Sequence, residues 1–390
     1  MKRVVQYIQK FSTSHWGGAE EGILHLAGAL RAFGFASEVW TTTVFGGMDQ
    51  ERLPDVVVRR FPGWYLTKAE RAGAGSGKAA FSHRLLWEIL RGRGIDLLHV
   101  HGHNRMASLV IAAAKRRRIP VVLTLHSQFL HLSPRWRYWF QTEYGIGRAS
   151  SLIAVNESIL KSIASAGLAR GRATVIPNGV DTRVFSAGDG GRFRQTIDIE
   201  DQPLVITVGR ICQAKNQMTI LRVFPLLEKK VPDIHWAVIG FPSDHAYYEQ
   251  LVQGVRQLDL GSRIHVIPGL PPRSEQLLDA YKAADVFALT SSHEAYPLVV
   301  LESWAAGLPV VANDVVGIGN VISNGVNGLL VHPHDADALA SAISLTLTDD
   351  SIRTDLSRNG LESARRQDWN HIAARLAAVY ERTVAQAESR

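Results

Sequence analysis

The sequence predicts an α/β protein with two doubly wound domains, each built on a parallel β-sheet covered by helices. Short apolar runs alternate with amphipathic stretches from end to end, as they do where crossover helices join parallel strands. The chain has 390 residues, which is more than one hydrophobic core usually serves. Hydrophobic residues make up 46% of the chain, so there is enough apolar material to fill two cores.

Strands are expected in the first half wherever a short β-branched or aromatic run lies between turn residues. The seven runs are 4–8, 37–42, 56–60, 97–101, 121–125, 151–155 and 173–177. A helix is expected over 19–33, because its apolar residues recur with helical spacing and Gly34 follows as a stop. Together these elements define a first domain over residues 1–185.

The second half repeats the scheme in a domain over residues 186–368. Its expected strands are 204–209, 235–240, 264–268, 286–290, 309–313 and 328–332. The small residues SAGDGG at 186–191 are interpreted as the linker between the domains. The helical pattern over 369–390 is expected to pack back onto the first domain.

Composition also indicates the cellular compartment of the protein and the charge of its binding partners. A single cysteine, Cys212, excludes an internal disulfide and is typical of a reducing compartment. The N-terminus has no apolar core of a signal peptide, and no run approaches the 18 or so apolar residues that a membrane span needs. We therefore expect a cytoplasmic protein. The net charge of +7 favours an anionic partner.

One segment mixes basic and aromatic residues in a way that suits a membrane interface. It includes Arg135, Trp136, Arg137 and Trp139. Such a mixture favours a lipid-diphosphate acceptor or peripheral contact with the inner membrane. It is equally compatible with a helix that packs one aromatic face into its own domain. Nucleic-acid binding is disfavoured, because the basic residues do not form a stripe.

Ligands of doubly wound domains bind beyond the carboxyl ends of the strands, so the loops there are the candidate site. After the first strand, Gly17 and Gly18 precede a helix whose free N–H groups suit a phosphate. A Gly-Gly turn is more often only a turn, and the G-x-G-x-x-G spacing of a nicotinamide dehydrogenase is absent from the sequence.

Histidines follow the fourth and fifth strands of the first domain. Alternation along a strand is expected to place His99, His101 and His103 on one side, and His126 ends the next strand. A zinc site is disfavoured, because no cysteine or acid cluster accompanies them. His126 is the candidate for contact with a substrate hydroxyl.

The second domain places cations and acids after its strands. Arg210 and Lys215 follow one strand, and two such cations would hold a diphosphate without a metal. Glu294 precedes a short helix and Glu302 lies within it. The backbone N–H groups of Leu298, Val299 and Val300 at the start of this helix are expected to be free for an oxygen-rich ligand. For any one of these residues taken alone, an ordinary surface role stays open.

Taken together, these motifs resemble the family 4 retaining glycosyltransferases over nearly the full chain. The matching stretches are GGAE at 17–20, HVHGH at 99–103, TLHS at 124–127, IPNGVD at 176–181, VGRICQAKN at 208–216, the run 281–312 and the run 324–343. The pair of glutamates eight residues apart is specific only in that setting. The resemblance implies the GT-B fold, in which two Rossmann-like domains face each other across a cleft.

The resemblance also implies an activity and roles for single residues. An enzyme of this type moves a sugar from a nucleotide-diphosphate donor to an acceptor hydroxyl with retention at the anomeric carbon. Arg210 and Lys215 would hold the donor diphosphate, Glu302 would bond the ribose, and Glu294 would lie beside the donor sugar. His126 would contact the sugar or stabilise charge, while Gly17 and Gly18 would let the first domain approach the diphosphate. No metal and no cofactor are implied.

The donor and the acceptor are predicted less directly. GDP-mannose is the first expectation for the donor and UDP-glucose the second, although no residue decides between them. A polyprenyl-diphosphate-linked glycan in bacterial surface-polysaccharide assembly is the expected acceptor. A nucleotide-sugar hydrolase or epimerase, or a non-catalytic nucleotide-sugar binding protein of the same fold, remain as alternatives.

Overall fold

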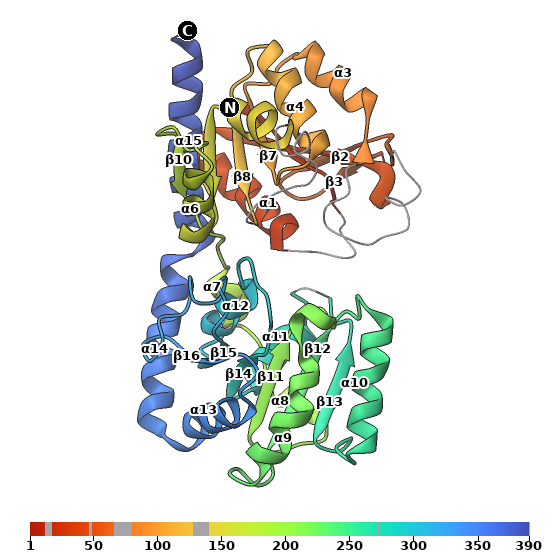
Figure 1. Ribbon diagram of the computed structural model, residues 1–390, viewed down its shortest axis with the longest axis vertical. Helices are drawn as coiled ribbons and strands as arrows, with labels where there is room; N and C mark the ends of the chain where they lie inside the picture. The colour runs from red at the N-terminus through yellow and green to blue at the C-terminus, as the bar shows by residue number, and fades with distance from the viewer. Residues whose placement is uncertain (12–17, 47–48, 66–79, 128–139, 272, 390) are drawn as a thin grey trace. The chain divides into compact units, whose positions relative to one another are not determined.

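The computed structural model describes residues 1–11, 18–46, 49–65, 80–127, 140–271 and 273–389 (Figure 1). These residues form two compact units. Unit 1 comprises residues 1–178 and 369–390, and unit 2 comprises residues 179–368. Each unit is built on its own parallel sheet, which agrees with the predicted α/β class.

The sheet of unit 1 has the strand order β10-β9-β8-β7-β1-β2-β4-β3 within the described residues. Its strands are β1 (Lys2–Ile8), β2 (Phe35–Thr42), β3 (Gln50–Arg52), β4 (Val57–Phe61), β7 (Leu97–His101), β8 (Val121–Leu125), β9 (Ser151–Ala154) and β10 (Ala173–Val175). All the pairings are parallel except that of β3 with β4. The strand order reverses between β1 and β7, so the two halves of the sheet diverge from this pair. A separate short hairpin joins β5 (Trp64–Tyr65) and β6 (Ala80–Phe81).

Helices of unit 1 begin where polar side chains cap their free N–H groups. The α-helices are α1 (Gly18–Ala29), α3 (His83–Arg91), α4 (Arg105–Arg116), α6 (Glu157–Ser165) and α15 (Trp369–Glu388). Ser82, Asn104 and Asn156 each accept a hydrogen bond from the backbone three residues on. The helix expected over 19–33 changes after α1 to a 3-10 turn over Leu30–Phe33 and ends at Gly34, whose φ is 80°.

The last helix of the chain completes the core of unit 1. In Figure 1, α15 (blue) runs beside the sheet of unit 1, although unit 2 precedes it in sequence. Its apolar face joins Leu26 and Leu30 in one buried cluster. Trp369 stacks on His25 with ring centroids 5.5 Å apart, and a side chain at Gly22 would meet the same indole at 3.1 Å. Glycine at position 22 therefore lets α1 and α15 approach closely.

Unit 2 has a parallel sheet in the order β13-β12-β11-β14-β15-β16 within the described residues. The strands are β11 (Leu204–Val208), β12 (His235–Gly240), β13 (Ile264–Pro268), β14 (Val286–Leu289), β15 (Val310–Asn313) and β16 (Leu329–Val331). Alternate residues of β11 enter different cores, Val205 on one face and Ile206 on the other. Both faces are apolar because helices cover both. The order reverses between β11 and β14.

The α-helices of unit 2 lie between Thr182 and Arg366. They are α7 (Thr182–Phe185), α8 (Gly190–Thr196), α9 (Ile220–Glu228), α10 (His245–Gln257), α11 (Glu275–Ala283), α12 (Leu298–Ala305), α13 (Ala336–Thr348) and α14 (Asp350–Arg366). None of the helices within the described ranges is long and apolar enough to cross a membrane.

The segment 186–191, predicted to be a linker, instead packs into unit 2. A side chain at Gly188 would lie 2.3 Å from the carbonyl oxygen of Leu278 in α11, and one at Gly190 would lie 2.7 Å from that of Lys282. The N–H of Asp189 donates to buried Asp279 at 2.6 Å. The small residues thus serve close packing rather than mobility. The structure divides the chain after residue 178, one short helix earlier than the predicted boundary after 185.

Candidate functional site

The reversal point of the unit 2 sheet brings two predicted site loops together. β11 and β14 are neighbours, and the loops after them carry Arg210, Lys215 and Glu294. In an open α/β sheet, the loops after two such strands diverge and leave room for a ligand. The topology therefore places these residues where a ligand of this fold class binds.

Lys215 and Glu294 form an ion pair across these two loops. The Lys215 ammonium contacts Glu294 Oε1, and the exposed fractions of the two side chains are 18% and 8%. The hydroxyl of Ser291 donates to the same carboxylate oxygen at 2.8 Å. The hydroxyl of Thr290 donates to the Lys215 carbonyl oxygen at 2.9 Å. The acid and the cation are therefore held before any ligand arrives.

The backbone around Glu294 is fixed by contacts from the loop that follows β15. A side chain at Gly317 would lie 1.9 Å from the carbonyl oxygen of Glu294, so the two loops touch through their backbones. Asn313 at the end of β15 donates to the Thr290 carbonyl oxygen at 2.7 Å. On the other side, the N–H of Ser292 donates to the carbonyl oxygen of Ala214 at 3.0 Å. Glu294 therefore sits in a loop anchored on both sides.

Arg210 differs from Lys215 in having an exposed side chain. Within the described ranges, no acid pairs with its guanidinium. Its backbone is nevertheless fixed, because Gln217 donates to its carbonyl oxygen at 2.9 Å. The stem of Lys215 passes 3.8 Å from the Cβ position of Gly209, so the two cations belong to one compact loop. An anionic ligand at this loop would meet the exposed guanidinium of Arg210 and the ammonium of Lys215, which is already paired with Glu294.

Glu302 is positioned by an aromatic hydroxyl that the sequence analysis did not single out. Tyr281, a fully buried residue of α11, donates its hydroxyl to Glu302 Oε2 at 2.7 Å. The Tyr281 ring meets the Phe185 ring edge-on at 5.5 Å. A tyrosine in an apolar helical pattern resembles any core residue, so the sequence carried no signal for this contact.

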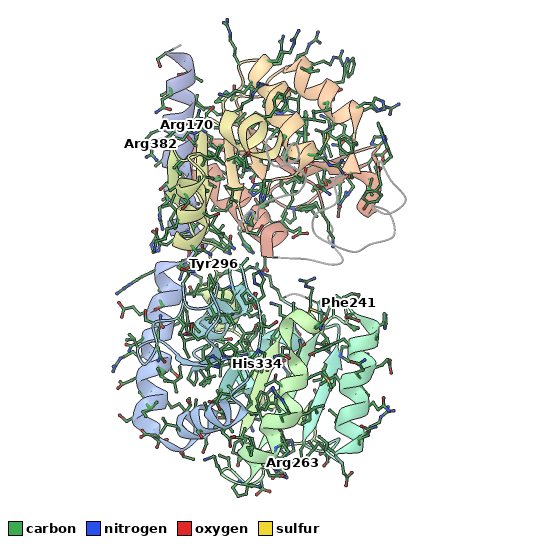
Figure 2. All side chains as sticks on the ribbon, in the orientation of Figure 1. Arg170, Phe241, Arg263, Tyr296, His334 and Arg382 are labelled. Carbon is green, nitrogen blue, oxygen red and sulfur yellow. The ribbon has the colours of Figure 1, made fainter. Side chains whose placement is uncertain are left out.

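The start of α12 differs from the prediction. Pro297 immediately precedes the helix, which begins at Leu298. The N–H of Leu298 donates to the Tyr296 carbonyl oxygen at 3.1 Å, and that of Val300 donates to the Pro297 carbonyl oxygen at 3.0 Å. The expectation of three free amides was wrong for these two, because the turn before the helix satisfies them locally. Tyr296, labelled in Figure 2, also donates its hydroxyl to Gln367.

Unit 1 presents buried histidines at the reversal point of its own sheet. His99 and His101 on β7 have ring centroids 4.1 Å apart, as the predicted alternation requires. The ring nitrogens of His99 lie 2.6 Å from the Tyr380 hydroxyl and 2.7 Å from the Thr124 hydroxyl. His126, which follows β8, places Nε2 3.3 Å from His101 Nδ1.

These histidines are neutral at physiological pH. Burial lowers the pKa of His99 to about 3 and that of His126 to about 4, and it lowers the pKa of His101 well below the ordinary value. No cluster of three potential metal ligands occurs in the part of the chain that the structure describes. A cavity of about 30 Å³ beside these rings has room for a water molecule or two.

Several predicted residues lie outside the described ranges. These are Gly17 and the basic-aromatic residues Arg135, Trp136, Arg137 and Trp139. Gly18 is described and begins α1. The phosphate-binding role of the two glycines stays a prediction. So does the role of the basic-aromatic residues in binding an acceptor or a membrane.

Two family models match the chain, one in each unit. Residues 16–184 match the model described as Glycosyltransferase Family 4, and residues 191–363 match Glycosyl transferases group 1. The first part of the chain is therefore similar to the family 4 domain, and the second part is similar to the group 1 domain. Arg210, Lys215, Glu294 and Glu302 all lie in the group 1 domain.

Relatives of these glycosyltransferase domains extend over the whole chain. The D-inositol 3-phosphate glycosyltransferase of Actinosynnema mirum is 28% identical over 96% of this chain and 94% of its own length. The protein of the same name from Mycolicibacterium smegmatis is 34% identical over 57% of this chain, and that from Mycolicibacterium gilvum is 32% identical over 55%. These two matches span about half the length of each relative, 50% and 48%.

Solved structures establish the fold. Anabaena HepE in complex with UDP and glucose has a TM-score of 0.78 at 21% identity, covering 98% of this chain and all of that one. WaaG, a glycosyltransferase involved in lipopolysaccharide biosynthesis, has a TM-score of 0.71 at 17% identity, covering 96% of this chain and 99% of its own. The predicted GT-B fold of two Rossmann-like domains is confirmed.

Proposed function

We propose that this protein transfers a hexose from a nucleotide-diphosphate sugar to an acceptor hydroxyl, with retention and without a metal ion. The observation that carries the proposal is the loop with Arg210 and Lys215, which lies beside Glu294 at the reversal point of the unit 2 sheet. A fork-shaped guanidinium and a point-like ammonium are the side chains that bind diphosphate oxygens.

The two cations would stabilise the leaving group. As the bond between the anomeric carbon and the phosphate oxygen breaks, negative charge grows on the departing diphosphate. Arg210 has no acid partner among the described residues and can bind this group directly, while Lys215 can share its protons between Glu294 and the phosphate. Preorganised charges aimed at a developing charge commonly contribute the largest part of catalysis.

The acceptor hydroxyl would form the new bond on the same face of the sugar. Its oxygen bonds to the anomeric carbon, and its proton passes to an oxygen of the departing phosphate. The products are the glycoside and a nucleoside diphosphate. Glu294 would lie beside the donor sugar, and Glu302, whose carboxylate is oriented by the Tyr281 hydroxyl, would accept hydrogen bonds from the ribose hydroxyls.

Two donors are proposed for testing. GDP-mannose is the first expectation from the sequence, although no residue decides for it. UDP-glucose has one observation in its favour, because the similar Anabaena HepE structures contain UDP, glucose or UDP-glucose. We therefore place UDP-glucose first in the test and GDP-mannose second.

Two acceptor classes follow in the same way. The sequence favours a polyprenyl-diphosphate-linked glycan at the inner membrane, in polysaccharide assembly. The names of the curated relatives favour a soluble inositol phosphate. Glycosylation of soluble acceptors with no binding to anionic vesicles would exclude the membrane-bound acceptor.

A thermal-shift screen with UDP, GDP, ADP and their sugar conjugates, without added metal, tests the donor site. A ligand at a hundred times its dissociation constant stabilises the fold by about 2.7 kcal/mol. A selective shift with one diphosphate would support the site, and its loss in Arg210→Ala would assign it. Release of free sugar without an acceptor would indicate a hydrolase. The absence of any shift would contradict the proposal.

A further inference from the structure

Three polar side chains cross the centre of the unit 1 sheet in one hydrogen-bonded row. They come from neighbouring strands: Gln6 from β1, His101 from β7, and His126 from the end of β8. His101 Nε2 lies 3.0 Å from Gln6 Oε1, and His101 Nδ1 lies 3.3 Å from His126 Nε2. We call Gln6, His101 and His126 the histidine relay. Gln6 is fully buried and His101 nearly so.

The hydrogen bond at the Gln6 end of the row determines which atoms donate and which accept along it. The amide nitrogen of Gln6 donates to the hydroxyl of Ser37 on β2 at 2.9 Å, so the amide oxygen faces His101. A carbonyl oxygen can only accept, and therefore His101 Nε2 carries the proton. A neutral imidazole has one N–H, which leaves His101 Nδ1 as an acceptor.

The protonation of His101 in turn determines which nitrogen of His126 carries the proton. Because His101 Nδ1 accepts, His126 Nε2 is the nitrogen that donates, and the proton of the neutral ring is there. His126 Nδ1 is then left with a lone pair. Among the described residues, none bonds to this atom. The rings stay neutral because burial lowers the pKa of both histidines.

We propose that Gln6 and His101 are positioning residues that fix the tautomer of His126, so that Nδ1 accepts a hydrogen bond from a substrate hydroxyl. This inference rests on the proposed function, in which His126 contacts the sugar or the acceptor. It narrows that role, because a neutral ring with a bare Nδ1 cannot donate to a phosphate oxygen or stabilise negative charge.

The relay also explains a polar residue in an apolar strand. Gln6 lies between Val5 and Tyr7 in β1, where an apolar side chain would pack without needing partners. A buried amide is costly unless it is hydrogen-bonded. Here both of its ends are bonded, one to Ser37 and one to the relay. The amide therefore has both of its hydrogen-bonding ends paired. Because its oxygen only accepts and its nitrogen only donates, it also fixes which nitrogen of His101 carries the proton.

Tautomers can be measured directly on the intact protein. The nitrogen shifts of an imidazole differ strongly between a protonated and a bare nitrogen, so histidine-labelled protein can be studied by two-dimensional NMR. Comparison with His126→Gln assigns the His126 signals. We expect a protonated Nε2 and a bare Nδ1 on both His101 and His126 at pH 7. Protonated Nδ1 atoms would mean that the Gln6 amide faces the other way, and would overturn the inference.

Gln6→Met tests whether the relay acts on turnover. Methionine has a similar length but no amide oxygen, so His101 loses the partner that fixes its proton. We expect mixed His126 tautomers and a fall in kcat of about ten- to a hundredfold, which is the loss typical when the partner that orients a metal-bound histidine is removed. The thermal shift with the donor should change little. An unchanged tautomer and unchanged kcat would contradict the positioning role.

A matched control removes a hydroxyl from the same cluster without touching the relay. Tyr380→Phe deletes the group that bonds His99 Nδ1, and should leave the His126 tautomer and kcat close to the wild type. Failure of the proposed function would appear separately, because a protein that binds no nucleotide sugar still reports its tautomers. If the donor turns over but Nδ1 is protonated, only the relay inference fails.

Discussion

Gly317 is a position where the addition of one methyl group should displace the candidate site. A Cβ added there would lie 1.9 Å from the carbonyl oxygen of Glu294, whereas such atoms essentially never come closer than 3.0 Å. In Gly317→Ala the two loops must therefore separate by about 1.1 Å or more. Overpacking of this kind costs about 1–3 kcal/mol, and a displacement of about 1 Å at a reacting centre can reduce turnover about a hundredfold.

Steady-state glycosyl transfer and thermal melting measure the two effects in one preparation. Gly319→Ala is the matched control in the same loop. Its Cβ would lie 3.2 Å from the end of the Asp314 side chain, which can rotate away, and at an ordinary 3.9 Å from the Val315 carbonyl oxygen. We expect Gly317→Ala to lose about a hundredfold in kcat and Gly319→Ala to stay close to the wild type. If the two variants behave alike, the backbone contact does not position Glu294 and the reasoning is refuted.

Three further predictions concern other described contacts. Lys215→Ala should fold and should lower turnover about a hundred- to a thousandfold, because the ammonium beside Glu294 is lost; turnover like that of the wild type would exclude the assigned role. Tyr281→Phe should raise the KM for the donor severalfold with little change in kcat, because Glu302 loses the hydrogen bond that orients it. An unchanged KM would show that this hydrogen bond does not contribute to donor binding. Finally, burial lowers the pKa of His99 to about 3 and that of His126 to about 4, while the unfolded chain takes up these protons near 6.5. The stability they contribute is complete above about pH 6.5 and is lost as the pH falls toward 4, so the melting temperature should decrease across that window. A flat melting temperature there would contradict the buried neutral state.

The fold was accessible from the sequence because its signals are local. Runs of β-branched residues between turn residues located the strands, and β7 and β8 coincide with the predicted 97–101 and 121–125. Gly34 and Gly307 both adopt the positive φ that their place after a helix indicates. The parallel topology then follows from the alternation of strands and helices. Periodicity and stop signals therefore carry most of the architecture.

What the sequence left open depends on contacts between distant segments. The glycines of 186–191 look like a flexible linker until α11 is seen against them. The two satisfied amides of α12 depend on how the chain bends at Pro297. The partnership of Gln6 with His101 joins residues 95 positions apart. Propensity and spacing contain no information about such pairs, so only the structure could assign them.

The placement of α15 has a consequence for how the protein is made. Most of unit 1 is synthesised before unit 2, but unit 1 lacks part of its core until Trp369 and the residues after it have left the ribosome. At about 5–20 residues per second, the wait after residue 178 is roughly 10–40 s. Unit 2, which is continuous in sequence, can fold during that interval. The nascent N-terminal half meanwhile exposes the apolar surface around Leu26 and Leu30 that α15 later covers, and chaperones would have their longest opportunity to bind there.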